Sequence, residues 1–153
     1  MLRLVVVVFM LVSVGAILAS SGRSSAPARI EHICGLTDRQ FLSNYQVQLE
    51  AVGMYGNDYL HGSAKAQEVI DTAREAARVV RTSAPQDPSL LVVRRYAPAM
   101  FLEFGRAVKA RAAGRNATPA MYRSYSIGTQ VNEILREAQP GLAAAGCDVT
   151  SLY

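Results

Sequence analysis

Tyr59 and His61 are two side chains close in sequence that could share one chemical task. Both lie in the segment 57–62, and tyrosine and histidine can each ligate haem iron. Residues two apart in a helix point about 200° away from each other, so a helix would separate the pair. We therefore expect a polar hinge between two helices here and no paired haem site, although Tyr59 alone could still hold iron.

The two cysteines, Cys34 and Cys147, lie near the two ends of the body of the chain. His32 stands close to Cys34, but two residues do not fill the tetrahedral shell of a zinc ion, so we expect no metal site. The absence of a C-x-x-C motif argues against a redox thiol pair. In an oxidising compartment, two cysteines of a small domain usually bond to each other. We predict a Cys34–Cys147 disulfide, which would stabilise the fold by about 4–5 kcal/mol in the chain-entropy model.

Glu103 is a carboxylate whose sequence neighbours suggest a shifted pKa. It lies among Met100, Phe101 and Phe104, and apolar surroundings raise the pKa of a carboxyl group toward the range of an acid–base catalyst. The alternative is a carboxylate at the edge of the apolar stripe that pairs with an arginine. No second carboxylate is placed to assist it, and the sequence has neither a G-x-S-x-G motif nor a glycine-rich phosphate loop. We therefore expect a protein that is not an enzyme.

Tyrosine outnumbers the other aromatic residues, with seven tyrosines, four phenylalanines and no tryptophan. Tyr122 and Tyr125 fall on neighbouring positions of one helix face. Tyrosines from several helices could line a cleft for a planar or apolar ligand, and the alternative is ordinary packing with the hydroxyls at the surface. The candidate ligand-binding residues are Tyr59, His61, Tyr122 and Tyr125.

Basic residues are concentrated in the middle of the chain. Residues 74–123 carry ten Arg and Lys residues against three acidic ones, a net charge of +7, whereas the whole chain has +4. Such a stretch could contact anionic lipid or an anionic envelope polymer, or it could form a solvated face beside the acidic ends. We expect no nucleic-acid partner. The candidate face for an anionic partner consists of Arg94, Arg95, Arg106, Lys109, Arg111 and Arg115.

The first 28 residues have the order of an export signal. A positive charge near the start is followed by an apolar stretch and then by small residues, with Ala26 and Ala28 placed for cleavage. The alternative is an uncleaved membrane anchor, because residues 4–22 contain no charge over 19 positions, close to the length that spans a bilayer. Either interpretation places the body outside the cytoplasm, secreted or membrane-anchored. We assign residues 1–28 to this signal or anchor and residues 29–153 to a single helical domain.

Hydrophobic spacing in the body predicts four amphipathic helices and no strand. We expect them from 37 to about 55, from between 58 and 63 to 82, from 88 to about 113, and from 118 to about 139. Short connections between four such helices predict an all-α fold, an antiparallel bundle closed by one disulfide.

The strongest local signal begins the first of these helices. Thr37 is the expected N-cap, with Gln40 reaching back to its amide and Leu36 packing against Phe41. Further along, Asp87 before a proline should open the third helix. Pro98 should stop or kink that helix.

Two stretches resemble the small exported haem-binding proteins of mycobacteria, the hemophore type. The first combines segments 57–60 and 67–70, the second runs from 125 to 147, and together they cover about a third of the chain. The matching positions of the second stretch are Tyr125, Val131, Leu135, Pro140, Leu142 and Cys147. The resemblance implies a helical domain bracketed by two cysteines. In that family the haem tyrosine is followed by a histidine one helical turn later, whereas His61 follows Tyr59 by two residues. The resemblance therefore implies the disulfide-closed helical architecture better than it implies haem binding.

These observations lead to two functional hypotheses. The first is an exported, non-enzymatic cell-envelope protein that binds a macromolecule, a lipid or another envelope protein. It rests on the export signal, the helical body and the basic midsection. The second is a carrier of a small apolar or planar ligand such as haem, and a cavity between the helices would favour it. No resident cofactor is assigned.

Overall fold

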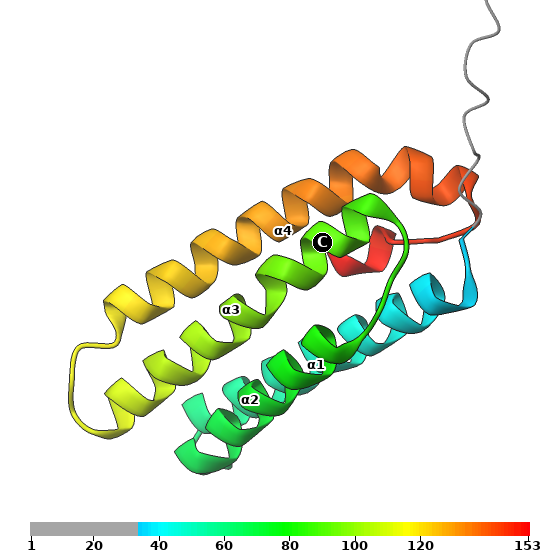
Figure 1. Cartoon of the computed structure of the whole chain (residues 1–153). Coiled ribbons are helices and arrows are strands. Elements are labelled where there is room, and N and C mark those ends of the chain that lie inside the picture. Colours follow the sequence, from blue (N-terminus) through cyan, green and yellow to red (C-terminus); the bar gives the residue numbers. More distant parts are fainter. Residues whose placement is uncertain (1–33) are drawn as a thin grey trace, which may run out of the picture. The chain divides into compact units, whose positions relative to one another are not determined.

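Four helices make up most of residues 34–153, the part of the chain that the computed structural model describes (Figure 1). The elements are α1 (Leu36–Leu60), α2 (Ala66–Thr82), α3 (Pro88–Ala112), α4 (Thr118–Ala144) and a short 3-10 turn, η1 (Thr150–Leu152). No strand occurs in this part, so the expected all-α fold of four helices is confirmed. The signal or anchor assigned to 1–28, with its apolar residues 4–22, and His32 lie outside the described residues. Within residues 34–153 no helix is long and apolar enough to cross a bilayer.

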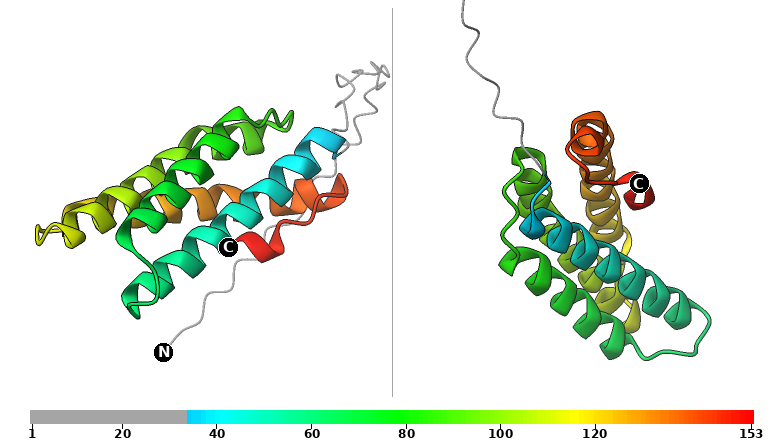
Figure 2. Two further views of the ribbon diagram at one scale, coloured as in Figure 1. Left: turned by 90° about the horizontal axis from the view of Figure 1, so that it is seen from below. Right: turned by 90° about the vertical axis from the view of Figure 1, so that its right-hand side faces the viewer.

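Each helix packs against the next one in the chain, and successive helices run in opposite directions (Figures 1 and 2). The first and last helices, α1 and α4, share no comparable contact. At one end of the bundle the C-terminal segment lies between them, where η1 packs against α4. The bundle is therefore a row of neighbouring helices whose two outer members are separated by a gap.

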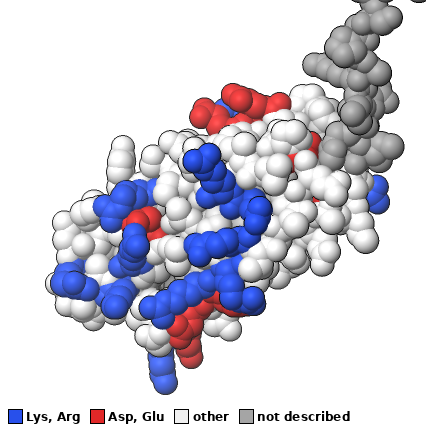
Figure 3. All heavy atoms as spheres, in the orientation of Figure 1, with Lys and Arg blue, Asp and Glu red and all other residues white. Residues whose placement is uncertain are grey.

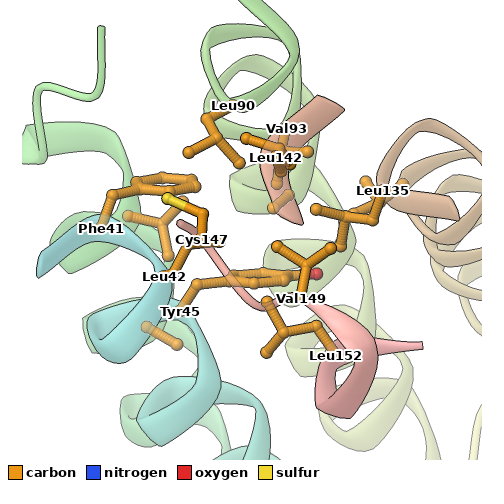
Figure 4. Packing of buried hydrophobic residues seen from close by; sticks show 14 of the residues in the cluster. Phe41, Leu42, Tyr45, Leu90, Val93, Leu135, Leu142, Cys147, Val149 and Leu152 are labelled. Atoms are coloured by element: carbon orange, nitrogen blue, oxygen red, sulfur yellow. The ribbon is translucent and has the colours of Figure 1, made fainter. Parts of the chain in front are cut away.

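The largest buried side chains meet at the end that carries this C-terminal segment (Figure 4). Phe41 and Tyr45 of α1 stack with ring centroids 6.2 Å apart, and Tyr45 meets Phe101 of α3 edge-on, also at 6.2 Å. Val149 and Leu152 complete the cluster from the C-terminal side. Burial raises the pKa of the Tyr45 hydroxyl. Burying each large apolar side chain stabilises the fold by about 1.5–3 kcal/mol, so the apolar core is strongest here.

A disulfide joins Cys34, just before α1, to Cys147, just after α4. Their Cα atoms are 5.5 Å apart across a sequence separation of 113 residues, and the predicted bond is confirmed. The Cys34 N–H also donates to the carbonyl of Ala145 at 2.9 Å, which adds a second link between the same two segments. A structural disulfide indicates a non-reducing compartment.

Gly35 and Asp38 organise the start of α1, and the expected cap at Thr37 is wrong. The Asp38 carboxylate accepts the N–H of Gly35 at 3.4 Å. It also accepts the N–H groups of Gln86 and Asp87 at 2.6 and 3.1 Å, which ties the α2–α3 connection to the start of α1. A local capping motif cannot reveal partners 48 and 49 residues away.

Two further expectations about α1 differ from the structure. Leu36 is 82% exposed, so it does not pack on the buried Phe41. The helix also continues past Gly53 and Gly56 to Leu60. Glycine costs only about 1 kcal/mol in a helix interior, and the packing of α1 on α2 outweighs that cost.

Prolines lie at the start of α3 and α4 as predicted, but those inside the two helices do not end them. Asp87 caps α3 as predicted, since its carboxylate accepts the N–H groups of Ser89 and Leu90 at 2.8 and 3.2 Å. Pro98 lies inside a continuous α3, so of the two predicted alternatives, a stop or a kink, the stop is excluded. Pro140 lies inside α4, which continues to Ala144, beyond the expected end at about residue 139. Pro98 is buried between packed helices, and this burial compensates for the hydrogen bond that proline cannot make.

Candidate functional site

An open groove lies between the last turns of α1, the last turns of α3 and the first turns of α4. Its volume is about 780 Å³, within the range of small-molecule sites. The groove lies between the two outer helices, α1 and α4, at the end of the bundle opposite the disulfide. We call it the tyrosine groove, and the residues that define it are Gly53, Tyr59, Phe104, Arg111, Tyr122 and Tyr125.

Two glycines on α1 shape the groove in different ways. At Gly56 an added Cβ would lie 2.8 Å from the Cζ atom of Phe104, so the phenyl ring packs on bare backbone. At Gly53 an added Cβ would meet nothing within 4 Å, because this position faces open space. Ala107 and Val108 are buried and continue the apolar floor on α3. The floor is therefore apolar, and α1 contributes no side chain at two of the positions that line it.

Three of the four predicted ligand-binding residues line this groove. Tyr59 comes from the end of α1 and is half-buried, whereas Tyr122 and Tyr125 come from α4 and are 71% and 73% exposed. Leu60 and Met121 add apolar surface beside them, at 63% and 43% exposure. The structure thus brings tyrosines from two helices, far apart in sequence, to one apolar groove.

His61 is not among the residues that line the groove. It follows α1 as the C-cap residue, and its Nδ1 atom lies 2.9 Å from the carbonyl oxygen of Asn57. The Ser63 N–H and hydroxyl both donate to the Asp58 carbonyl, at 2.8 and 3.0 Å. His61 therefore terminates a helix within a hydrogen-bonded turn, while Tyr59 alone of the pair reaches the groove.

Arg111 is the charged residue in the lining of the tyrosine groove. It belongs to none of the ion pairs among the described residues. The segment 105–123, which supplies much of the lining, has five basic residues and no acidic one. Lys and Arg side chains gather toward the end where α3 leads into α4 (Figure 3). This distribution favours a ligand or surface with negative charge.

The candidate face for an anionic partner divides into two groups. Helical periodicity places four of its residues within about 120° on one side of α3: Arg94, Arg95, Arg106 and Lys109. Arg111 turns to the groove instead, and Arg115 follows α3 in the connection to α4. The Arg94 Nε donates to the Arg81 carbonyl at 3.0 Å at the end of α2, so this cation also supports the fold.

Glu103 is buried where α3 meets α4, and it binds two arginines. The Arg123 Nε donates to one carboxylate oxygen at 2.9 Å, and Arg106 donates to the other. Burial alone would raise the pKa of Glu103, but the hydrogen bonds from Arg123 and Arg106 outweigh it and lower the pKa below its ordinary value. The interpretation with a raised pKa is therefore wrong, and the alternative, a carboxylate paired with arginine, is the one that the structure shows. A carboxylate that stays ionised has no proton to donate at neutral pH, so an acid role for Glu103 loses its basis.

No group of three or more His, Cys, Asp or Glu side chains among residues 34–153 is placed to hold a metal ion. The sulfur of Cys34 is bonded to Cys147 and is not available as a ligand.

The groove itself is not visible in the sequence patterns. Gly53 and Gly56 read as residues that weaken a helix, yet their spacing of three places them on one helix face. That spacing is the signal that could have indicated an open or closely packed surface. Phe104 and Met121 carry no pattern that separates them from ordinary core residues.

Comparisons with protein-family models, with curated proteins and with solved structures find no match for this chain. The resemblance to hemophore-type proteins therefore stays a prediction, and the candidate site rests on its own geometry.

Proposed function

We propose that this chain is an exported, non-enzymatic binding protein that holds a small ligand with an apolar body in the tyrosine groove. The observation that supports it is the groove, an open space of about 780 Å³ between α1, α3 and α4 with an apolar floor and three tyrosines. Tyrosine offers a flat apolar face and a hydroxyl at its tip, which suits planar or extended ligands.

The charge of the groove narrows the ligand class. Arg111 lies in the lining, and no acidic residue does. A ligand that combines an apolar body with a carboxylate would match both features, because the guanidinium can bind the carboxylate while the body rests on the floor. Haem and a long-chain fatty acid share this chemistry, and they differ in shape and in the presence of iron.

Titration of the full chain with each of two probes tests this proposal. Hemin binding is followed by its Soret absorption, and binding of a fluorescent fatty acid is followed by its emission. Gly53→Leu should fill the groove without strain, because a Cβ there meets no atom within 4 Å. We expect it to weaken binding of the preferred probe at least about tenfold, the equivalent of 1.4 kcal/mol.

Gly141→Leu is the matched control. Gly141 lies in α4. Like Gly53 it has nothing within 4 Å of an added Cβ, but it does not line the groove. This variant should bind both probes as the unchanged chain does. Equal affinity in the Gly53→Leu and Gly141→Leu variants, or no binding of either probe to the unchanged chain, would contradict the proposal.

Substitution of Tyr59 and His61 distinguishes haem from other ligands. If hemin binds through iron, Tyr59→Ala should abolish the tyrosinate absorption, and His61→Ala should leave it, since His61 bonds to the α1 backbone. Loss of tight hemin binding in both variants would contradict our expectation that the pair forms no haem site. It would instead favour the hemophore interpretation.

A second candidate function uses the basic side of α3. Four cations lie within one sector of that helix, and Figure 3 shows Lys and Arg gathered on the face it presents. An anionic envelope polymer is the partner that this face fits. Binding to such a polymer should fall steeply with salt. It should also fall with Arg95→Gln plus Lys109→Gln, and salt-independent binding would exclude this use of the face.

A further inference from the structure

We infer that the open end of the bundle, formed by the end of α1, the 113–117 connection and the start of α4, docks on an anionic lipid bilayer. Exposed apolar residues collect here, with Leu60 at 63%, Met121 at 43% and Tyr122 at 71% exposure. A folded domain rarely exposes neighbouring large apolar side chains unless they contact a partner. All three line the mouth of one groove, so they share one end of the molecule.

Charge complementarity selects the partner. Arg111 and Arg115 are exposed beside these apolar residues, and neither belongs to an ion pair among the described residues. Basic residues near a membrane surface attract anionic lipid, and tyrosine is enriched at the boundary between headgroups and acyl chains. Exposed apolar side chains next to cations are the combination that interfacial protein segments use.

Cations outnumber the acidic residues at this end of the bundle. Asp58 at the end of α1 is half-buried, whereas Arg111 and Arg115 are exposed. Glu68 accepts the Lys65 N–H at 2.7 Å at the start of α2. Lys65 itself adds a cation to the same turn.

Docking in this orientation has a consequence for the tyrosine groove. Its mouth would face the headgroup layer, so an apolar ligand could pass between bilayer and groove without crossing water. The docking surface shares Arg111 and Tyr122 with the groove but includes none of the groove floor, so a substitution in the floor distinguishes a failure of one proposal from a failure of the other. Gly53→Leu should block the groove but leave docking unchanged.

The absence of tryptophan from the sequence provides a clean probe. Tyr122→Trp introduces a single fluorophore at an exposed position of the docking surface. The full-length variant is mixed with vesicles of phosphatidylcholine, with or without phosphatidylglycerol, that contain lipid brominated at shallow depth. We expect the tryptophan emission to shift to shorter wavelength and to be strongly quenched by the brominated lipid in the anionic vesicles at low salt. Both effects should be small in the neutral vesicles.

Two comparisons make the result specific. Val47→Trp is the matched control, because Val47 is 55% exposed on α1 about 20 Å before its end and should stay unquenched. Arg111→Gln with Arg115→Gln, added to Tyr122→Trp, should lower the anionic-vesicle partition roughly 25-fold, since each cation contributes about fivefold.

Three outcomes would overturn the inference. The first is no quenching of the Tyr122→Trp variant in anionic vesicles at low salt. The second is equal quenching of the Val47→Trp variant, which would show that contact with lipid is not specific to this end. The third is equal quenching in neutral vesicles, which would show that the cations do not direct docking. Far-ultraviolet circular dichroism of each variant checks that the helices are retained.

Discussion

The gap between α1 and α4 is filled at one end of the bundle and open at the other. At one end the gap is filled by Val149 and Leu152, and the Cys34–Cys147 bond holds the filling segment in place. At the other end Gly53 faces open space and Phe104 packs on Gly56, and the gap remains open above them as the tyrosine groove. The difference shows how one helical scaffold can separate the part that stabilises it from the part that is free to bind.

Removing the disulfide should produce the largest effect on stability. The double variant Cys34→Ser, Cys147→Ser frees the ends of a long chain loop, and we expect a loss of about 2–5 kcal/mol in the free energy of unfolding. Urea denaturation followed by circular dichroism measures it. Reducing the unchanged chain should give the same loss, and an unchanged midpoint would show that packing alone closes this end.

Truncating a side chain of the C-terminal segment should have the next largest effect. Leu152 is only 6% exposed, and Leu152→Ala should cost about 2–3 kcal/mol through lost burial and the cavity it leaves. Leu36→Ala is the matched control, since Leu36 is 82% exposed and should change stability by less than about 0.5 kcal/mol. Equal losses in both variants would mean that the C-terminal segment does not fill the gap as described.

Glu103→Gln tests the polar contact that holds α3 to α4 nearer the open end. We expect a loss of about 1 kcal/mol at neutral pH, a modest value because both arginine partners are more than half exposed. The folded state lowers the pKa of Glu103, so its contribution is present above the ordinary pKa of 4.5 and is lost as the pH falls below it. Denaturation at a series of pH values should therefore show a weaker acid dependence in the variant. A parallel pH profile would assign the acid sensitivity to other groups.

The smallest expected difference in stability is between alanine variants of the two glycines that line the groove. Gly53→Ala should stabilise the chain by about 0.5–1 kcal/mol, because alanine favours the helix and its Cβ meets no atom. Gly56→Ala places a Cβ 2.8 Å from the Phe104 ring, which must shift, so this variant should be about 1 kcal/mol less stable than Gly53→Ala. Thermal unfolding compares the two, and a reversed order would show that the ring moves aside at no cost.

Local signals in the sequence predicted the local features of the fold. The Asp87 cap, the helical periodicity and the pairing of the two cysteines depend on neighbouring residues or on simple counting, and the structure confirms each of them. The hydrogen bonds from Asp38 to the α2–α3 connection were not predictable in this way, since they join residues 48 and 49 positions apart.

The candidate site was predicted only in part, for a similar reason. Tyrosine content indicated residues suited to an apolar ligand, and Tyr59, Tyr122 and Tyr125 do line one groove. The groove itself depends on what is absent, namely side chains at Gly53 and Gly56 and a chain segment between the outer helices. The spacing of the two glycines places them on one helix face but does not show what lies opposite them, and the missing segment leaves no pattern in the sequence.

The C-terminal segment and the groove occupy different parts of the length of α1. Leu152 and Val149 belong to the same buried cluster as Tyr45, and the groove lining on α1 extends only from Gly53 to Leu60. At 1.5 Å per residue this stretch measures about 11 Å along the helix axis. No residue of the C-terminal segment lines the groove. A molecule that lies along α1 in the groove would therefore cover about two helical turns, and the rest of an extended fatty acid would project beyond it.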